Sequence, residues 1–247
     1  RELVHMLEKM NSPSHGLVVE DRRPTTIKTR VVAHSQQVVR VDREESEPVT
    51  EASIERIITT VKEQTGSIDA IVVSDYGKGV VTRSLMDGLR SLGQDGQPIL
   101  AVDPTVRNLA LYKDVTLITP NNYEAQQMSG IHIEDDQSLR RAGAQLLEEL
   151  GCQTVLITQG DKGMTLVEGN GETTQIPTVA RKVFDVSGAG DTVIAAFTLA
   201  LAADLTPNEA ALLSNLAAGI VVGEVGTAAV AASRLKEILI DTALGRK

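Results

Sequence analysis

Short apolar runs alternate with amphipathic stretches along most of the chain. Four runs have the length and continuous hydrophobicity that are typical of buried parallel strands: Ala70–Ser74, Ile99–Asp103, Val115–Thr119 and Thr154–Thr158. Helical periodicity marks the stretches around and between them, at Ala52–Lys62, Arg83–Leu92, Asn122–Met128 and Leu139–Leu150. Such alternation implies right-handed βαβ crossovers. We therefore expect an α/β fold with a doubly wound, mostly parallel sheet flanked by helices.

The two ends of the chain depart from this alternation. Residues of alternating polarity predict a β-hairpin at Ile27–Ala33 and Val38–Asp42, after a short helix at Glu2–Met10. The remaining predicted elements are a strand at Met164–Val167, an apolar helix at Thr192–Ala203, two alanine-rich helices around Asn208–Val222, a loop at Gly223–Ala229 and a closing helix from Ser233.

Composition excludes several classes of function. The chain has 247 residues and a formal net charge of −9, with dispersed Lys and Arg and no Trp, which argues against nucleic acid as a partner. A single cysteine, Cys152, excludes an internal disulfide and fits a reducing, cytoplasmic compartment. The four histidines show no pair at metal-ligand spacing, which argues against a zinc site. The longest uncharged apolar run, Val193–Ala203, is well short of the roughly 20 residues that cross a bilayer.

The most informative segment is Asp185-Val186-Ser187-Gly188-Ala189-Gly190-Asp191, which leads directly into the apolar helix. Glycines at 188 and 190 let the backbone turn sharply and bring bare N–H groups to a helix N-terminus, which is an anion-binding arrangement. A carboxylate there would repel a phosphate, so Asp191 fits better as a base that takes a proton from an attacking hydroxyl. The alternative is a tight strand-to-helix turn in which Asp191 only complements the helix dipole.

This segment resembles the Asp-x-x-Gly-Ala-Gly-Asp motif of the ribokinase-like (PfkB) family of sugar kinases. The resemblance implies that Asp191 is the catalytic base. It also implies that the amides of Gly188, Ala189 and Gly190 hold the transferring phosphate, and that Asp185 helps to shape a monovalent-cation site.

Two further segments match motifs of the same family in the expected order. Thr119-Pro120-Asn121-Asn122-Tyr123-Glu124 matches the Asn-x-x-Glu motif, which implies that Asn121 and Glu124 organise Mg²⁺ and phosphate through water. Thr158-Gln159-Gly160-Asp161-Lys162-Gly163 matches the Thr-x-Gly-x-x-Gly loop, which implies that Thr158, Gly160 and Gly163 lie near the nucleotide phosphates. Each has a structural alternative, because the first is also a capping-box pattern and the second is also an ordinary turn between strands.

A narrower resemblance concerns the segment from Lys28 to Asp42, which has a Lys-Thr-Arg strand followed by Gln-Gln and Arg-x-Asp. This segment, Ser74–Gly79 and Val102–Pro104 look like the corresponding parts of bacterial heptose 7-phosphate kinases of lipopolysaccharide synthesis. Three basic residues could then meet an anionic sugar phosphate: Arg30, Arg40 and Lys78. The alternative is that Arg40 and Asp42 are cross-strand surface partners.

The resemblance covers about Thr25 to Leu239 and begins in the middle of the family's pattern. The family's opening Gly-Asp strand and its Gly-Gly-Ala-x-Asn helix start are not in this sequence, so we interpret the chain as an N-terminally incomplete kinase domain. Within a single domain over 1–247 we expect a lid-like hairpin at 25–42 and a nucleotide-binding core at 52–245. The family's C-terminal loop covers the adenine, which makes Asn215 and Gly226 candidates for the nucleotide edge, although both also fit simple packing and turn roles.

Together these features predict an ATP-dependent sugar kinase that acts on the anomeric hydroxyl of a heptose 7-phosphate. ATP, Mg²⁺ and a monovalent cation such as K⁺ are the cofactors that the resemblance implies, and a homodimer paired through the hairpin is a further expectation. Two alternatives stay open. One is another PfkB kinase acting on ribose, fructose or a nucleoside, and the other is a nucleotide-binding fragment without catalytic activity.

Overall fold

The computed structural model describes residues 2–21, 23–33, 36–92, 98–180 and 183–243. It divides into two compact units. Unit 1 comprises Arg1–Ser67 and Gly77–Gln94, and unit 2 comprises Ile68–Tyr76 and Asp95–Lys247. Among the described residues, no helix is long and apolar enough to cross a membrane.

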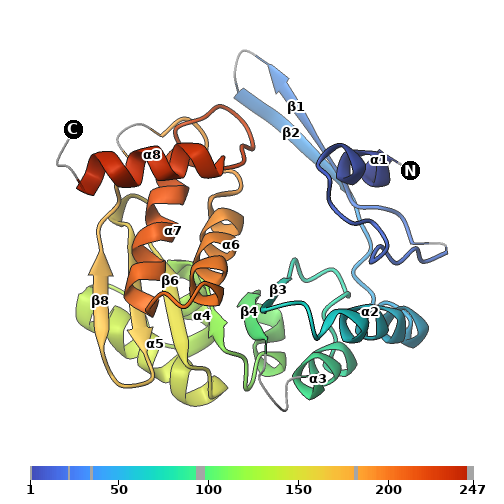
Figure 1. The fold of residues 1–247 in the computed structure, drawn as a ribbon, viewed down its shortest axis with the longest axis horizontal. Coiled ribbons are helices and arrows are strands. Elements are labelled where there is room, and N and C mark those ends of the chain that lie inside the picture. The colour runs from blue at the N-terminus through green and yellow to red at the C-terminus, as the bar shows by residue number, and fades with distance from the viewer. Residues whose placement is uncertain (1, 22, 34–35, 93–97, 181–182, 244–247) are drawn as a thin grey trace. The chain divides into compact units, whose positions relative to one another are not determined.

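The described residues of unit 1 form a two-stranded antiparallel hairpin and helices (Figure 1). Its elements are α1 (Glu2–Lys9), β1 (Ile27–Ala33), β2 (Gln36–Arg43), α2 (Glu51–Gln64) and α3 (Arg83–Ser91). The predicted hairpin and helices are confirmed, with β2 starting two residues earlier than expected. Helices α2 and α3 approach closely at Gly88, where an added Cβ would lie 2.2 Å from the Ile58 side chain, so a larger residue would force that side chain to shift.

Unit 2 is built on a six-stranded sheet in the order β3-β4-β5-β6-β7-β8. Its strands are β3 (Ala70–Ser74), β4 (Ile99–Asp103), β5 (Leu117–Ile118), β6 (Thr154–Thr158), β7 (Met164–Glu168) and β8 (Thr173–Ile176). Strands β3 to β6 pair in parallel, and β7 and β8 are antiparallel. The predicted mostly parallel sheet is therefore confirmed. The prediction that the first strand is buried is wrong, because β3 is an edge strand in this order and leaves Val72 44% exposed.

Helices cover both faces of this sheet. The helical elements of unit 2 are η1 (Val106–Leu111), α4 (Asn122–Ser129), α5 (Asp136–Leu150), η2 (Gly160–Lys162), α6 (Ala189–Ala202), α7 (Pro207–Val221) and α8 (Ala232–Ala243). On one face Leu156 and Leu166 join the buried cluster formed with α6 and α7, which run together in Figure 1. The alternating residues Ile157 and Val167 meet α5, where Gly143 allows its backbone to come close.

Two details of unit 2 differ from the sequence prediction. The region around Asn208–Val222 forms one helix, α7, instead of two. It begins at a capping box between Thr206 and Glu209 with proline in the first turn, and it contains no residue that would interrupt it before Val221. Strand β8 was not predicted, because only Ile176 of its four residues is buried and the hydrophobic signal is weak.

Candidate active site

The Gly-Ala-Gly segment forms the N-terminal end of α6. Gly188 is the N-cap with φ of 80°, a left-handed conformation that glycine adopts without strain. Within the described residues no side chain caps this end. The Ala189 amide donates to the Val186 carbonyl at 3.2 Å, whereas the Gly190 and Asp191 amides lie in the first turn, where a helix offers no acceptor of its own, and can meet an anion. The hydroxyl of Thr192 donates to the Gly188 carbonyl at 2.8 Å and fixes the turn. The predicted glycine turn at a helix N-terminus is therefore present, and its binding of a phosphate stays a prediction.

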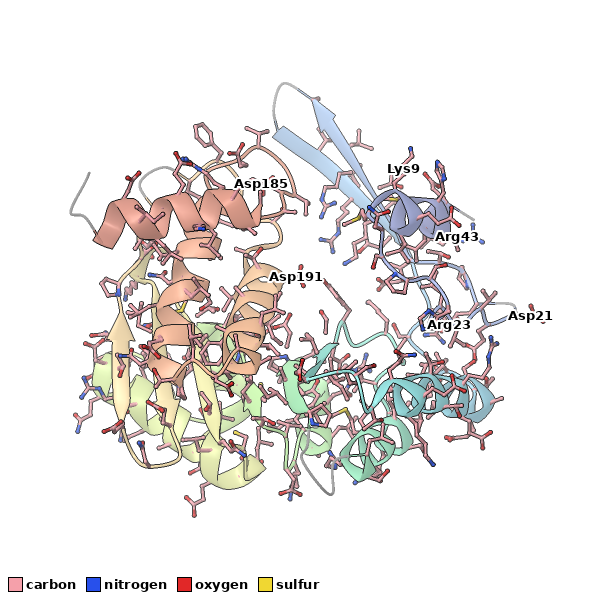
Figure 2. The ribbon with its side chains drawn as sticks, viewed as in Figure 1. Lys9, Asp21, Arg23, Arg43, Asp185 and Asp191 are labelled. Carbon is pink, nitrogen blue, oxygen red and sulfur yellow. The ribbon has the colours of Figure 1, made fainter. Side chains whose placement is uncertain are left out.

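Asp191 lies in the first turn of α6 and exposes its carboxylate (Figure 2). The hydroxyl of Tyr76, from the segment that follows β3, donates to this carboxylate at 3.1 Å to Oδ1 and 3.4 Å to Oδ2. Burial, followed by the charge of Asp191, raises the pKa of Tyr76. The phenol is therefore protonated at neutral pH and remains a hydrogen-bond donor to Asp191.

Asp103 is the last residue of β4, next to the end of β3 that Tyr76 follows, and it brings a further carboxyl group to this edge of the sheet. Burial raises its pKa from 3.8 to about 7, and the negative charges of Glu124 and Asp191 add to this effect. The Thr119 hydroxyl lies near enough to favour the charged form but falls short of hydrogen-bond geometry. In the sequence, Asp103 was identified only as the last residue of a predicted strand and as part of the Val102–Pro104 segment, and its place at a strand end was the signal that could have marked it as a site residue.

Asn121 and Glu124 form the capping box that their spacing predicted. The Asn121 side chain accepts from the Glu124 amide at 2.9 Å, and the Glu124 carboxylate accepts from the Asn121 amide at 2.8 Å. Burial raises the pKa of Glu124, so this carboxyl sits in an environment that disfavours its charge. The structural alternative is thus confirmed, and the metal role of Glu124 stays a prediction.

The carboxyl groups of unit 2 fit a divalent cation in charge and ligand type. Burial is the main cause of the raised pKa of Asp103, and the negative charges of Glu124 and Asp191 raise it further; a cation would offset the effect of those two charges. Carboxylate oxygen is also the ligand that Mg²⁺ prefers. The described residues contain no group of three or more acidic, His or Cys side chains close enough to enclose a metal by themselves. An ion here would therefore need oxygen ligands from water or a bound phosphate.

Asp185 occupies the turn before α6. Its carboxylate accepts from the Ser187 amide at 2.9 Å, and its own amide donates to the Val222 carbonyl at 3.4 Å. These contacts fix the turn that precedes α6 and attach it to the C-terminal end of α7. The cation role that the family resemblance implied for Asp185 stays a prediction.

A cavity of about 440 Å³ joins the two glycine-rich segments. Thr158, Gly160 and Gly163 line it from one side, and Ala189 and Gly190 line it from the start of α6. Much of the remaining wall is apolar and comes from Met164, Val183, Val186, Val193, Ala218 and Val222. An apolar wall beside the N-terminus of a helix suits a flat base attached to phosphates.

The loop Thr158–Gly163 has the turn geometry that its alternative reading predicted. Gly163 has φ of 93°, and a Cβ there would lie 2.1 Å from the Ile176 carbonyl oxygen. Gly160 also has positive φ, at 61°, but faces open space. The Thr158 amide donates to the Pro120 carbonyl at 3.0 Å, which joins this loop to the segment that begins α4. Gly163 is therefore required by the fold, whereas Gly160 is free to face a ligand.

The two C-terminal candidates occupy different positions. Asn215 lines the cavity from α7, but its side-chain amide donates to the Pro177 carbonyl at 2.8 Å, so its nitrogen already has a structural partner. Gly226 has φ of 81° in the following loop and is not among the residues that line the cavity. Contact of either residue with a nucleotide stays a prediction.

The basic candidates Arg30, Arg40 and Lys78 all belong to unit 1. Arg30 lies directly opposite Arg40 in the hairpin register, and both side chains are exposed. The Arg40 Nε lies 3.0 Å from Asp42 Oδ1, and Lys78 pairs with Glu44. Arg40 and Asp42 thus form the ion pair that the alternative interpretation held, but within one strand and not across two, because both lie on β2, two positions apart and on the same face.

Sequence reasoning did not identify Arg23 (Figure 2). Its guanidinium donates to the carbonyls of Glu47 at 2.9 Å and Glu45 at 3.3 Å, and also to the carbonyl of Lys78. The side chain thereby joins the segment after the hairpin to the glycine-flanked loop at Lys78. Only tertiary structure brings these carbonyls together, so local sequence carried no signal for the role.

Comparison with known proteins assigns the family. The family model described as pfkB family carbohydrate kinase matches residues 1–234. This chain belongs to the pfkB family. Similar curated members include the bifunctional protein HldE of Desulfatibacillum aliphaticivorans, 46% identical over 228 residues, and that of Citrifermentans bemidjiense, 43% identical over 242 residues. These alignments cover 92% and 98% of this chain but 47% and 49% of the relatives, so the chain spans about half the length of the curated relatives it matches.

Solved structures of pfkB-type kinases share the fold. Phosphofructokinase-2 of Escherichia coli in complex with potassium gives a TM-score of 0.78 at 20% identity, covering 98% of this chain and 78% of that one. Ribokinase of Thermotoga maritima gives 0.76 at 23% identity, covering 97% and 76%. The ribokinase-like α/β fold expected from the sequence is thereby confirmed.

Proposed function

We propose that the protein is an ATP-dependent kinase that phosphorylates the anomeric hydroxyl of a heptose 7-phosphate in the synthesis of lipopolysaccharide precursors. One observation carries the proposal. A single cavity is lined both by the Thr158–Gly163 loop and by Ala189 and Gly190, and Asp191 follows directly on the same helical turn. Phosphoryl transfer needs this combination of a nucleotide site, amides for the transferring group and a base at their edge.

Each part of the site has one task in the reaction. The apolar wall of the cavity takes the adenine, and the loop with Gly160 faces the phosphates. The sugar oxygen attacks the γ-phosphorus while the bond to the β–γ bridging oxygen breaks, and Asp191 accepts the proton of the attacking hydroxyl. The amides of Gly188, Ala189 and Gly190 stabilise the charge that develops on the phosphoryl group during its transfer.

We further propose that Glu124, together with the nearby carboxyl of Asp103, holds Mg²⁺ through water, and that Asp185 contributes to a K⁺ site. Bound Mg²⁺ would neutralise charge on the nucleotide phosphates. The raised pKa of Asp103 supports a cation at this position, because a positive charge would stabilise a carboxylate that burial and, to a lesser extent, the charges of Glu124 and Asp191 disfavour. The K⁺ proposal draws on the family resemblance of the Asp185–Asp191 segment and on the potassium complex of phosphofructokinase-2 from Escherichia coli, which shares the fold.

The heptose phosphate is the most specific part of the proposal. It draws on the resemblance of the hairpin and of the Ser74–Gly79 loop to heptose 7-phosphate kinases, and on relatives named bifunctional protein HldE at up to 46% identity. Arg30, Arg40 and Lys78 are the proposed phosphate contacts. Replacing each by alanine and comparing kcat/KM on heptose 7-phosphate and on the unphosphorylated heptose tests them. If the replaced residue contacts the phosphate, the variant should lose most of its preference for the phosphorylated sugar. If the residue only forms a surface ion pair, both kcat/KM values should change little.

The hairpin also supports the proposed homodimer. Ile27, Val31, Val39 and Val41 are each at least 46% exposed and, by the register, share one face of the hairpin. Covering this face with a second copy would remove apolar surface from water. Sedimentation of the wild type and of a Val39→Lys variant tests the pairing. Because the reaction consumes ATP, we place the protein in the cytoplasm.

Asp191→Asn tests the mechanism in the natural full-length gene product. The substitution keeps the shape of the helix start and removes the proton acceptor, so kcat should fall on the order of 10²- to 10⁴-fold while ATP affinity stays unchanged. Asp204→Asn is the matched control, because it removes an exposed carboxylate just beyond the other end of α6. Near-normal turnover by Asp191→Asn would reduce Asp191 to a dipole partner and refute the mechanism.

Two alternatives are separated by measuring ATP binding and turnover in parallel over a panel of sugars. A preference for ribose, fructose or a nucleoside would retain the kinase and remove the heptose assignment. Binding of ATP without turnover of any sugar would favour a noncatalytic nucleotide-binding module.

A further inference from the structure

The carboxylate of Asp191 already has a partner, Tyr76, which lies in the Ser74–Gly79 segment and to which the family resemblance assigned no role. The Tyr76 hydroxyl lies within hydrogen-bond distance of both carboxylate oxygens, at 3.1 and 3.4 Å. These are the oxygens that an attacking hydroxyl must reach at about 2.6–3.2 Å for its proton to be taken. Tyr76 and the incoming substrate therefore compete for, or share, the same two atoms.

Hydrogen bonds of the buried residue Asp75 hold the backbone next to Tyr76 in place. The preceding residue, Asp75, is 8% exposed, and its amide donates to the Asp103 carbonyl at 3.0 Å. Its Oδ2 accepts from the Asn108 side chain at 2.7 Å and from the Tyr112 hydroxyl at 2.6 Å. These hydrogen bonds anchor the end of β3 to β4 and to η1. The backbone from which the Tyr76 side chain extends is therefore fixed.

The side chain of Tyr76, in contrast, is open to solvent. The residue is 61% exposed, so its ring can swing without opening the core. The charged and titratable groups that act on the Tyr76–Asp191 pair are Asp103 at the end of β4 and, through Asp103, Glu124 at the start of α4. Both are acidic. The Tyr76 phenol is thus a neutral hydrogen-bond donor to the Asp191 carboxylate, in surroundings where Asp103 and Glu124 carry the same charge as Asp191.

We propose that Tyr76 is a positioning residue for Asp191, whose hydroxyl orients the carboxylate before the sugar binds and then yields one carboxylate oxygen to the sugar hydroxyl. The proposal rests on the proposed kinase function. A carboxylate has room for two donors, so after the exchange Tyr76 keeps the second oxygen and the first points at the substrate. Without Tyr76 the carboxylate would rotate freely and reach the reactive orientation less often.

The first test is independent of activity. The chain has three Tyr and no Trp, so ultraviolet absorbance follows tyrosine ionisation without interference, and a Tyr76→Phe variant identifies the Tyr76 transition by its loss. In Asp191→Asn the Tyr76 transition should move to lower pH, because the carboxylate charge that raises the pKa of Tyr76 is gone. Asp204→Asn should leave it in place. An unmoved Tyr76 transition in Asp191→Asn would show that the two side chains do not interact and would overturn the proposal.

The second test is kinetic and uses the full-length gene product. Tyr76→Phe keeps the ring and removes the hydroxyl, so we expect kcat to fall on the order of tenfold, with the KM for the sugar changed by less than about twofold. In an Asp191→Asn background the same substitution should have no further effect, since a residue that acts through Asp191 is silent once the base is gone. Equal losses of kcat in both backgrounds, or a raised KM with normal kcat, would overturn the positioning role.

The two tests separate this inference from the proposed function. If the wild type turns over no sugar, the kinase proposal fails, and the absorbance titration alone decides whether Tyr76 holds Asp191. If the wild type is active and Tyr76→Phe is as active as the wild type, the kinase proposal stands and the Tyr76 role falls.

Discussion

The Asp103 carboxyl provides a quantitative test of the electrostatics at the strand ends. Burial and the charges of Glu124 and Asp191 raise its pKa from 3.8 to about 7. Asp103→Asn keeps the size of the side chain and removes its ionisation. We expect the variant to be more stable to unfolding than the wild type at about pH 8, and to show no such gain at about pH 4.

The sign and the size follow from the two pKa values. Between pH 3.8 and about 7, the folded wild type retains a proton that the unfolded chain has released, so stability falls as pH rises through this window and is constant above it. At about 1.4 kcal/mol for each tenfold change, full ionisation withdraws on the order of 4 kcal/mol from the folded state. Solvent reaches part of the carboxyl and screens it, so a measured gain of about 1–4 kcal/mol for Asp103→Asn is expected.

Urea unfolding followed by circular dichroism, at a series of pH values in EDTA, measures the difference. Asp204→Asn serves as the control, because its side chain is exposed and its removal should shift stability little at any pH. Repeating the series with Mg²⁺ should reduce the gain, since a bound cation would stabilise the wild-type carboxylate. A gain that is the same at pH 4 and pH 8 would refute the reasoning, because a pH-independent effect cannot come from ionisation of Asp103.

Three further predictions concern single contacts. Glu124→Gln should raise the Mg²⁺ concentration needed for half-maximal activity and leave the melting temperature unchanged, because glutamine still completes the capping box; an equal loss of stability with no metal effect would leave only the cap. Gly163→Ala should lower the unfolding free energy by at least about 2 kcal/mol in urea titrations, since alanine is strained at φ of 93° and its Cβ meets a carbonyl; a neutral effect would contradict the loop geometry. Tyr112→Phe should cost about 1–3 kcal/mol in the same assay, because it removes a hydroxyl donor from the buried Asp75; no loss of stability would mean that the hydrogen bond to Asp75 contributes little.

Much of the fold could be predicted from the sequence because its signals are local. The runs Ile99–Asp103 and Thr154–Thr158 were placed at their observed bounds, since continuous apolar stretches between turns have few other interpretations. Val115–Thr119 was too long. The structure keeps only Leu117–Ile118 as strand, although the Thr116 and Thr119 amides also bond to carbonyls of β4. Helix bounds shifted where a cap decided them, as at Asp135, which starts α5 earlier than the hydrophobic pattern indicated.

The site was partly predictable for the same reason. Segments of the glycine-rich and capping motifs could be placed beyond the strand ends of unit 2, because each follows a strand or starts a helix. Tyr76 and Asp103 were not predicted to act on Asp191, since their contacts join β3, β4 and α6 across long sequence separations. The raised pKa of Asp103 depends on burial, which is a property of the packed structure and leaves no mark in the local sequence.

The hydrogen bond from the Thr158 amide to the Pro120 carbonyl has a consequence for ligand binding. It couples the Thr158–Gly163 loop beside the cavity to the start of α4, so a ligand that orders one of them also orders the other. A ligand that binds second then meets a loop whose conformational entropy has already been lost, which is a source of positive cooperativity without a change of shape. Thermodynamic linkage requires the effect to be mutual, so nucleotide should tighten the binding of a cation near Glu124 by the same factor as the cation tightens the binding of nucleotide.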